Sequence, residues 1–324
     1  HYVPELEPAF AASYRDFLAS LDRDVRVVFV VRRGDRDKLD AFLATTAWRG
    51  RSRVIEIDGT LGIWSKDRAL VAAHDPEDPI ELLIPARPRA GDGSRPSDWA
   101  IVPAMASAMG DVRTRELPLA FDAGDFAVSR DRVVFDVNSF ARNRLRGAKT
   151  RSEVRDRVRA LFGRDALMLG SEVGDVPRHH MSMYMALLDH DIALVGDPIA
   201  GRAIVGDDYA PGELSPETHR PLRADFRPAT IARFDRAAAD LQAAGFRVVR
   251  IATVPFDDKT YFAYTNGVFA EHVARVPSFG VGALDDSARR VYESLGWRVV
   301  PIASRDVYPL HGTIGCLVNV LRRR

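Results

Sequence analysis

Two stretches in the last third of the chain are close copies of each other. The first, "AAGFRVVRIAT", occupies residues 243–253, and the second, "SLGWRVVPIAS", occupies residues 294–304. Each reads as the end of an amphipathic helix, then a glycine, an aromatic residue, an arginine and a β-branched strand. A looser third copy, "RALFGRDALMLG", spans residues 159–170. A helix-to-strand unit that recurs in this way predicts an α/β protein made of repeated modules around a shared core.

Apolar runs of strand length alternate with helical patterns along the chain, as such modules require. We expect strands in "RVVFVV" (26–31), "RVIEI" (53–57), "ALVAA" (69–73), "ELLIPA" (81–86), "RVVFDV" (132–137) and "ALMLG" (166–170). Helices are expected at 150–163, 230–245 and 285–296, each ending at a glycine. The first of them opens with Thr150 and has Glu153 three residues later, which is the signature of a capping box.

Charge and cysteine content exclude several classes of protein. The chain has 324 residues with 46 Lys and Arg against 45 Asp and Glu, so no bulk charge favours nucleic acid or a membrane surface as a partner. One cysteine excludes an internal disulfide and a thiolate metal cluster, and we expect no metal and no cofactor. The chain starts at His1 and not at Met, which suggests a trimmed leader or a sequence boundary, so the compartment stays open.

The domain organisation follows from the loops, since none of them resembles a linker between independent cores. We therefore expect residues 1–324 to form one domain. The segment "DDYAPGELSPETHRPLRADFRP" (207–228) is long for a structureless loop, which suggests a lid or a specificity insert. The sequence does not indicate an oligomeric state.

The lone cysteine, Cys316, lies in "HGTIGCLVNV", between small residues and a strand-like run. It could be an inert buried side chain, or a nucleophile if a base and a means of stabilising the thiolate are present. The candidate base is in "VPRHHMSMYMALLDHD", where His179 and His180 precede an apolar run that turns at "LDHD". This places the pair at the mouth of a β-hairpin, although either histidine could equally be a solvated or capping residue.

Acidic residues in apolar surroundings complete the candidate set. Asp67 lies beside Trp64 at the expected start of a strand, and Asp122 and Asp125 flank Gly124 in "DAGD". Surface turns are the alternative interpretation for all three aspartates.

Taken in order, these motifs resemble the guanidino-group-modifying enzymes of the pentein superfamily, which include agmatine deiminase, peptidylarginine deiminase, arginine deiminase and dimethylarginine dimethylaminohydrolase. The order is W-x-x-D, D-x-G-D, His before an apolar strand, "TYFAYTNGVF" (260–269) and H-G-x-I-x-C-x-x-N. The opening "YVPELEPAF" (2–10) and the pair "YTNGVF" and "VPSFG" are similar to the agmatine deiminase group. The cysteine segment is similar to that of peptidylarginine deiminases.

The resemblance implies a fold and an activity. The fold is a five-bladed, pseudo-symmetric α/β propeller of ββαβ repeats. The activity is cleavage of a C–N bond in a guanidino group of a small-molecule or peptide substrate, through a covalent thiouronium on a cysteine. By position, Cys316 matches the nucleophile, His180 the general acid and base, and Asp122 the acid that orients the histidine.

The resemblance also assigns the substrate contacts. Asp67 matches the carboxylate that binds the guanidinium, a planar cation best held by bidentate acceptors. Asn266 matches an asparagine in the strand before the cysteine, and Trp64, Asp125 and Ser182 complete the set. From motif order we expect Cys316 to be partly exposed on the floor of a cleft, within a few ångströms of His180.

Three departures from the family pattern affect this interpretation. Most deiminases read His-x-Asp, whereas here Ser182 lies two residues after His180, where the aspartate would be. Gly315 replaces a larger residue before the cysteine, and Ala123 replaces a glycine of the D-x-G-D motif. The dimethylarginine hydrolases also lack the aspartate, so catalysis is not excluded. An amidinotransferase of the same family and a non-catalytic pentein that only binds a partner therefore remain as alternatives.

Overall fold

A computed structural model of the chain describes residues 1–72, 79–86, 101–129, 131–144, 147–189 and 191–321. The sequence predicts loops at "HDPEDP" (74–79) and "ARPRAGDGSRPSD" (86–98), which are rich in proline and charge, and both lie almost wholly outside the described residues. The chain divides into two compact units. The first unit comprises His1–Ala123 and Ile314–Arg324, and the second comprises Gly124–Thr313.

The first unit contains two sheets. Strands β1 and β2 are parallel and are joined by α2, while Tyr2 forms an additional bridge to Val31 of β1. In the second sheet β3 is antiparallel to β4, and β4 is parallel to β5. The elements are η1 (Pro4–Leu6), α1 (Glu7–Ala19), β1 (Val28–Arg32), α2 (Arg36–Ala44), β2 (Arg53–Ile57), η2 (Lys66–Arg68), β3 (Leu70–Val71), β4 (Ile80–Ile84), α3 (Ile101–Met109), β5 (Val112–Glu116) and α9 (Ile314–Leu317).

The second unit contains three sheets with one topology, in which an antiparallel pair is followed by a parallel pair. The sheets are β6 (Ala127–Val128), β7 (Arg132–Asp136) and β8 (Asp165–Leu169); β9 (Met185–Leu188), β10 (Ile192–Asp197) and β11 (Arg247–Ala252); and β14 (Val268–Ala270), β15 (Val273–Ser278) and β16 (Arg298–Ala303). The short strands β12 (Val254–Pro255) and β13 (Tyr261–Phe262) form a further pair.

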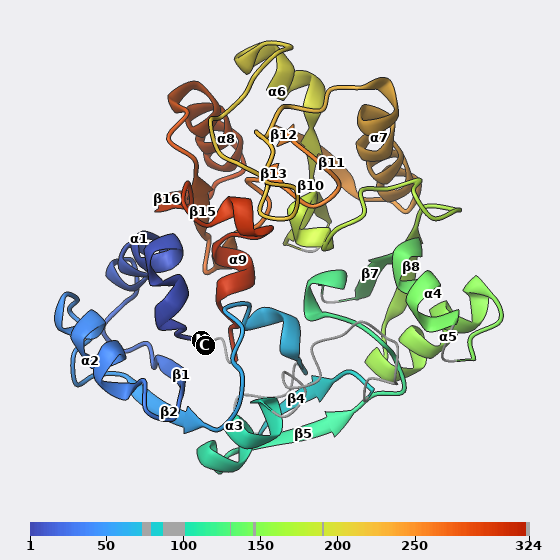
Figure 1. Cartoon of the computed structure of the whole chain (residues 1–324). Helices are drawn as coiled ribbons and strands as arrows, with labels where there is room; N and C mark the ends of the chain where they lie inside the picture. The colour runs from blue at the N-terminus through green and yellow to red at the C-terminus, as the bar shows by residue number, and fades with distance from the viewer. Residues whose placement is uncertain (73–78, 87–100, 130, 145–146, 190, 322–324) are drawn as a thin grey trace. The chain divides into compact units, whose positions relative to one another are not determined.

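Helices join the parallel strands of each sheet, because a parallel pair needs a long crossover. In the second unit these helices are α4 (Val137–Arg144) with α5 (Arg151–Phe162), α6 (Pro198–Val205) with α7 (Pro228–Ala243), and α8 (Gly282–Ser294). Figure 1 shows α5 beside β8, α7 beside β11 and α8 beside β16. Among the described residues, five sheets thus share a strand–helix–strand core, and four of them have the full ββαβ order. The predicted α/β class and the repeated module are confirmed.

The predicted elements agree closely with the observed ones. All six expected strands are present, β2 with the expected bounds. Thr150 caps α5 by accepting a hydrogen bond from the Glu153 amide at 3.2 Å, and Glu153 accepts one from the Lys149 amide at 2.6 Å. The helix ends at Gly163 with φ +61°, the left-handed conformation expected there.

Helix α8 begins three residues before the expected start. The sequence predicts that Asp285 begins the helix, but Asp285 lies within its first turn. Its carboxylate accepts hydrogen bonds from the backbone amides of Phe279 and Gly280 at 3.0 and 3.1 Å. Asp285 therefore fixes the preceding loop, and the helix starts at Gly282.

One core of the second unit is rich in aromatic residues. Phe262 stacks on Phe279 at 4.5 Å and meets Tyr308 edge-on at 4.7 Å between ring centroids. This packing fixes β13 and, with it, the turn that follows. Among the described residues, no helix is both long and apolar enough to cross a bilayer.

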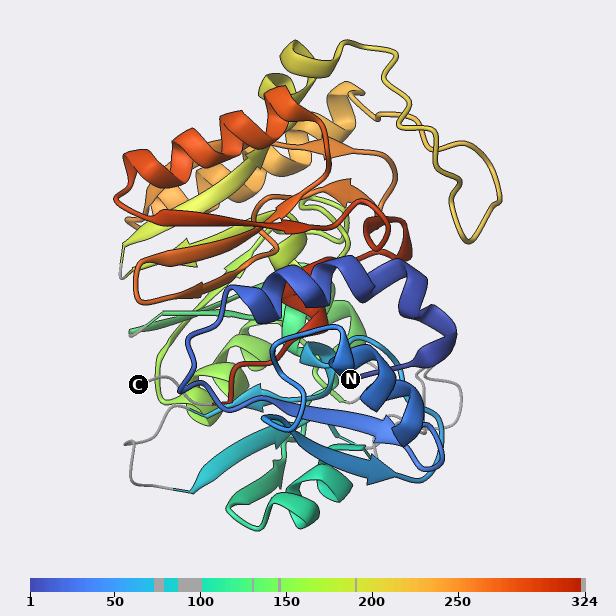
Figure 2. The same ribbon diagram turned by 90° about the vertical axis from the view of Figure 1, so that its left-hand side faces the viewer.

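The 207–228 segment is held by its own contacts and by contacts within the second unit. Figure 2 shows it in yellow as a long two-limbed loop. Leu214 and Pro221 form an antiparallel bridge across the limbs. Glu213 accepts hydrogen bonds from Arg305 at 2.5 Å and from Tyr308 at 2.9 Å. The segment is thus an anchored hairpin, and its function as a lid or specificity insert stays a prediction.

Candidate active site

Cys316 lies in the first unit, in the one-turn helix α9, and is buried with 2% of its surface exposed. Two parts of the prediction are therefore wrong, since the thiol is not partly exposed and residues 318–321 do not form a strand. Tertiary hydrogen bonds fix this segment. The Leu317 carbonyl accepts from the Ser65 hydroxyl at 2.5 Å and from the Tyr14 hydroxyl at 3.4 Å. The Asn319 amide donates to the Ala69 carbonyl at 3.0 Å.

Asp67 lies in the short 3₁₀ helix η2, and α9 packs directly against η2. The prediction that Asp67 starts a strand is wrong, because the chain makes this turn before β3 begins at Leu70. The carboxylate is buried, with 2% exposure, and Trp64 just before it is half-buried. The first unit alone therefore brings together the turn that carries the predicted nucleophile and the turn that carries the predicted guanidinium ligand.

The "DAGD" motif divides between the two units. Asp122 is half-buried and belongs to the first unit. Asp125 lies in η4 (Ala123–Asp125) and belongs to the second unit. Asp125 is 4% exposed and forms an ion pair with Arg142 of α4. This pair fixes η4 on α4. The substrate contact predicted for Asp125 and the orienting role predicted for Asp122 stay predictions.

Gly124 lies very close to the ring of His180. A Cβ atom at this position would lie 2.6 Å from both Cγ and Nδ1 of His180, well inside van der Waals contact. Only a residue without a side chain allows the histidine ring to lie against η4. The close contact with His180 therefore explains why the "DAGD" motif has a glycine at position 124.

His180 is 9% exposed and directly precedes η5 (Met181–Met183), which leads into β9. The predicted hairpin is confirmed, since β9 and β10 are antiparallel with Leu188 opposite Ile192. The ring of His180 stacks on that of His179, with centroids 4.5 Å apart and planes 13° apart. The predicted proximity of His180 to Cys316 stays a prediction, because the two residues belong to different units.

Ser182 and Asn266 are in contact. The Asn266 amide donates to the Ser182 hydroxyl at 3.3 Å and to the Met183 sulfur at 2.7 Å. Asn266 lies in the turn between β13 and β14 and not in a strand, which corrects the sequence prediction. Its carbonyl accepts from the Thr313 hydroxyl at 2.8 Å. Asn266 therefore supports the segment after His180 through direct contacts, and its predicted role as a substrate ligand stays a prediction.

Asp136, at the end of β7, was missed by the sequence analysis. It caps α4 by accepting from the Asn138 amide at 2.9 Å, and it accepts from the Tyr184 hydroxyl at 3.0 Å. Burial, reinforced by the negative charge of Asp125, raises the pKa of Asp136 to about 6. An aspartate between a strand and a helix in "FDVNSF" is a recognisable cap, but its buried partners come from distant parts of the chain.

Metal ligation finds no support within the described ranges, which contain no group of three or more His, Cys, Asp or Glu side chains arranged to bind an ion.

Solved structures that share the fold include agmatine deiminases. The C. jejuni agmatine deiminase superposes with a TM-score of 0.68 and 12% identity, covering 99% of this chain and 89% of its own. A Cys-to-Ser variant of the C. jejuni enzyme, solved with substrate bound, gives the same TM-score and coverage at 11% identity. The Enterococcus faecalis agmatine deiminase gives a TM-score of 0.68 and 13% identity, covering 97% of this chain and 86% of its own.

No family model matches the sequence, and no curated protein matches it either. The structural matches confirm the resemblance to pentein enzymes at the level of the fold.

Substitution of Gly124 by Ala should destabilise the second unit, because the new Cβ collides with the ring of His180. We expect a loss of roughly 1–3 kcal/mol in the free energy of unfolding, the usual cost of overpacking. Gly282→Ala is the matched control, since no atom lies within 4 Å of its Cβ position. Urea denaturation gives both values. In a His180→Ala background the cost of Gly124→Ala should shrink, and an unchanged cost would refute the proposed collision.

Asp136 should make the protein less stable as the pH rises from about 4 to about 6. Its folded pKa is raised above the unfolded value of 3.8, so the folded state keeps a proton that the unfolded state has lost. The shift corresponds to roughly 2–3 kcal/mol. Asp136→Asn keeps the cap but cannot ionise, so its stability relative to wild type should improve by this amount between pH 4 and pH 7. Urea denaturation across that range would contradict the assignment if the difference were constant.

Proposed function

We propose that this protein is a hydrolase that cleaves a C–N bond of a guanidino group in a small-molecule or peptide substrate. The observation that carries the proposal is the packing of α9 on η2, which places the helix that carries the sequence's one thiol against the helix that carries a buried carboxylate, within one unit. Asp67 supplies the anionic acceptor that a guanidinium requires. A fold shared with agmatine deiminases along nearly the whole chain supports the same activity.

In the proposed reaction the Cys316 thiolate adds to the guanidinium carbon. The bond from that carbon to one nitrogen then breaks, and the nitrogen leaves as ammonia or an amine after taking a proton from His180. This leaves a thiouronium on the sulfur. Water next adds to the same carbon while His180 accepts its proton, and cleavage of the S–C bond releases a ureido product and the thiolate. The Cys-to-Ser variant of the C. jejuni enzyme, solved with substrate bound, is consistent with this role for a cysteine.

The remaining predicted residues have supporting roles in the proposal. Asp122 orients His180, Trp64 and Asp125 line the substrate site, and Ser182 and Asn266 complete it. We further propose that residues 1–324 act as one catalytic domain in which the ββαβ modules form a pseudo-symmetric five-bladed propeller. The strand–helix–strand core that five of the six sheets in the described residues share supports this arrangement.

A second candidate function is a non-catalytic pentein that uses the fold for binding. Ser182 in place of an aspartate and the 2% exposure of Cys316 favour it. A third candidate, an amidinotransferase, differs only in the acceptor of the second step. A ureido-product assay over arginine, agmatine, methylated arginines and arginine peptides, with and without an added amine such as glycine, separates the three. Ureido product indicates the hydrolase, an amidinated amine the transferase, and neither product the binding protein.

Cys316→Ser should abolish turnover, because a hydroxyl at neutral pH is a far weaker nucleophile than a thiolate. His180→Ala should lower kcat by ~10²–10⁴-fold, the range expected for a general acid and base. The ureido-product assay measures both. The rate losses should not add in the double variant if both residues act in one reaction. Full activity in Cys316→Ser would refute the mechanism.

The control for these variants is His272→Asn, which changes an exposed histidine and should leave the rate unchanged. His272 has φ +55°, a conformation that asparagine tolerates.

Ser182 should weaken binding of unsubstituted guanidines, because a hydroxyl cannot provide a charged bidentate contact. We expect better activity on N-substituted or peptide substrates than on arginine or agmatine. Ser182→Asp should then raise kcat/KM for arginine or agmatine by ~10- to 100-fold, the equivalent of one hydrogen bond to a charged group. Ser182→Asn, which has the shape of aspartate without its charge, is the matched control. Equal values for the two variants would show that charge at position 182 is unimportant.

A further inference from the structure

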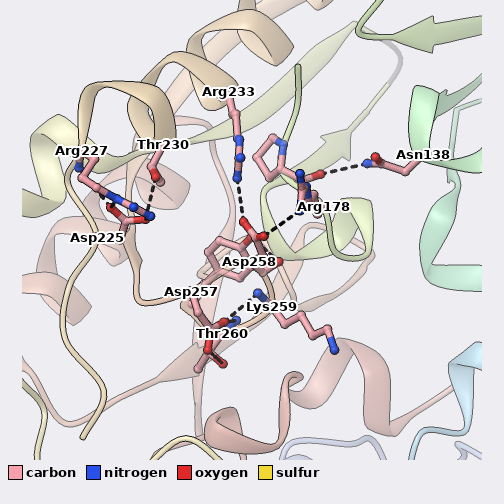
Figure 3. A network of polar contacts seen from close by, with 12 residues as sticks. Asn138, Arg178, Asp225, Arg227, Thr230, Arg233, Asp257, Asp258, Lys259 and Thr260 are labelled. Carbon is pink, nitrogen blue, oxygen red and sulfur yellow. Dashed lines mark hydrogen bonds and ion pairs between the residues drawn. The ribbon is translucent and has the colours of Figure 1, made fainter. Parts of the chain in front are cut away.

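The segment that carries the two histidines is anchored by contacts of Pro177, Arg178 and His179, the three residues before His180. The Asn138 amide donates to the Pro177 carbonyl at 3.3 Å. Arg178 donates to Asp258 at 3.1 Å, and Asp258 is held in turn by Arg233 at 2.7 Å. Figure 3 shows Asp258 between the two arginines. These contacts all lie in the second unit, so the backbone leading to His180 is fixed before any substrate binds.

His179 continues this series through its side chain. Its Nε2 lies 2.7 Å from the His311 carbonyl oxygen, and a carbonyl can only accept a hydrogen bond, so Nε2 carries the proton. Burial, together with the neighbouring His180, lowers the pKa of His179, which keeps the ring neutral. A neutral ring with one fixed tautomer therefore lies flat on His180, with planes 13° apart.

His311 is itself fixed by polar contacts. Its backbone adopts φ +73°, and this left-handed conformation ends η6 (Tyr308–Leu310). The Thr260 hydroxyl donates its one proton to the Asp257 carboxylate at 3.2 Å. The Thr260 oxygen must therefore accept the hydrogen bond from Nδ1 of His311 at 3.0 Å. Asp257 also accepts from the backbone amides of Lys259 and Thr260, as Figure 3 shows.

The hairpin of residues 207–228 reaches this network. Glu217 accepts from Lys259 at 2.6 Å and lies 3.6 Å from Nε2 of His311. The carbonyl that orients His179 thus belongs to a residue whose ring is held by Thr260.

We propose that His179 is a positioning residue, whose ring, fixed by the His311 carbonyl and stacked on His180, sets the plane of the His180 imidazole. This inference rests on the proposed function, in which His180 is the general acid and base. No contact of His179 with the substrate is required.

The stack acts in two ways. It restricts the rotation of the His180 ring, so that the proton-transferring nitrogen keeps one direction during both steps of the reaction. It also places a neutral aromatic face against His180, and such a face stabilises a cation. The protonated form of His180 is the one that must give its proton to the leaving nitrogen. Gly124 lies close to the same ring, as described above, so His180 is confined by both η4 and His179.

Three variants of His179 separate the stack from the hydrogen bond. His179→Phe keeps the stacked ring and loses the donor to His311. His179→Gln keeps a donor and loses the ring, and His179→Ala loses both. His272→Asn again serves as the control that leaves the site untouched. We expect kcat on the best guanidino substrate to fall by ~10- to 100-fold in His179→Ala with KM little changed, and to recover largely in His179→Phe.

A spectroscopic readout tests the stack whether or not the protein is active. In histidine-labelled protein the His180 ring protons, assigned with His180→Ala, should resonate upfield in wild type and in His179→Phe because of the neighbouring ring. They should move downfield in His179→Ala and His179→Gln. Unchanged His180 shifts in His179→Ala would overturn the inference. So would a loss of activity in His179→Phe as large as that of His180→Ala, since His179 would then be the acid and base itself.

The two hypotheses fail in different ways. If no guanidino compound is turned over while the His180 shifts respond as expected, the proposed function is wrong and the positioning contact stands. If turnover occurs and the shifts do not respond, the positioning role is wrong and the proposed function stands.

Discussion

The return of the C-terminal segment to the first unit is the constraint on which the candidate site depends. Its main contact is the Leu317 carbonyl, which accepts hydrogen bonds from Ser65 and Tyr14. Buried carbonyls need such partners, so these bonds determine where the turn of Cys316 lies. Because Ser65 is two residues from Asp67, the same bond brings the thiol segment to the carboxylate segment. Cys316 and Asp67, 249 positions apart in the sequence, thereby lie in the same unit.

The second unit supplies an ordered frame for His180. Asp125 pairs with Arg142, Asp136 caps the helix that carries Arg142, and Gly124 leaves room for the histidine ring. The His180 ring also stacks on the ring of His179, which is tied to His311. Most of these groups are polar and at least half-buried, and their mutual hydrogen bonds offset the cost of removing them from water. Such a frame is what a proton-transferring residue needs, since small displacements of the ring are costly to the rate.

Sequence reasoning succeeded where local patterns determine structure. The strand at 53–57, the cap at Thr150 and the glycine at 163 follow from periodicity and backbone preference alone, and each is present. It failed at Asp67, Asn266 and the residues after Cys316, where strands were expected and a 3₁₀ helix, a bend and irregular backbone are found. Those segments are fixed by long-range hydrogen bonds that no local pattern contains. The close approach of Gly124 to His180, the contacts of Asp136 and the stacking of His179 were missed for the same reason, although the order of the motifs was enough to predict the resemblance to pentein enzymes.

The claim that Cys316 forms a covalent bond to the substrate carbon can be tested directly by mass spectrometry. Protein mixed with its best guanidino substrate is quenched in acid during turnover, and the intact chain and its peptides are weighed. The account predicts an added mass equal to the substrate minus the leaving ammonia or amine. This adduct should map to the peptide that contains Cys316 and be absent from Cys316→Ser. Steady product formation with no adduct on that peptide, or with an adduct elsewhere, would contradict it.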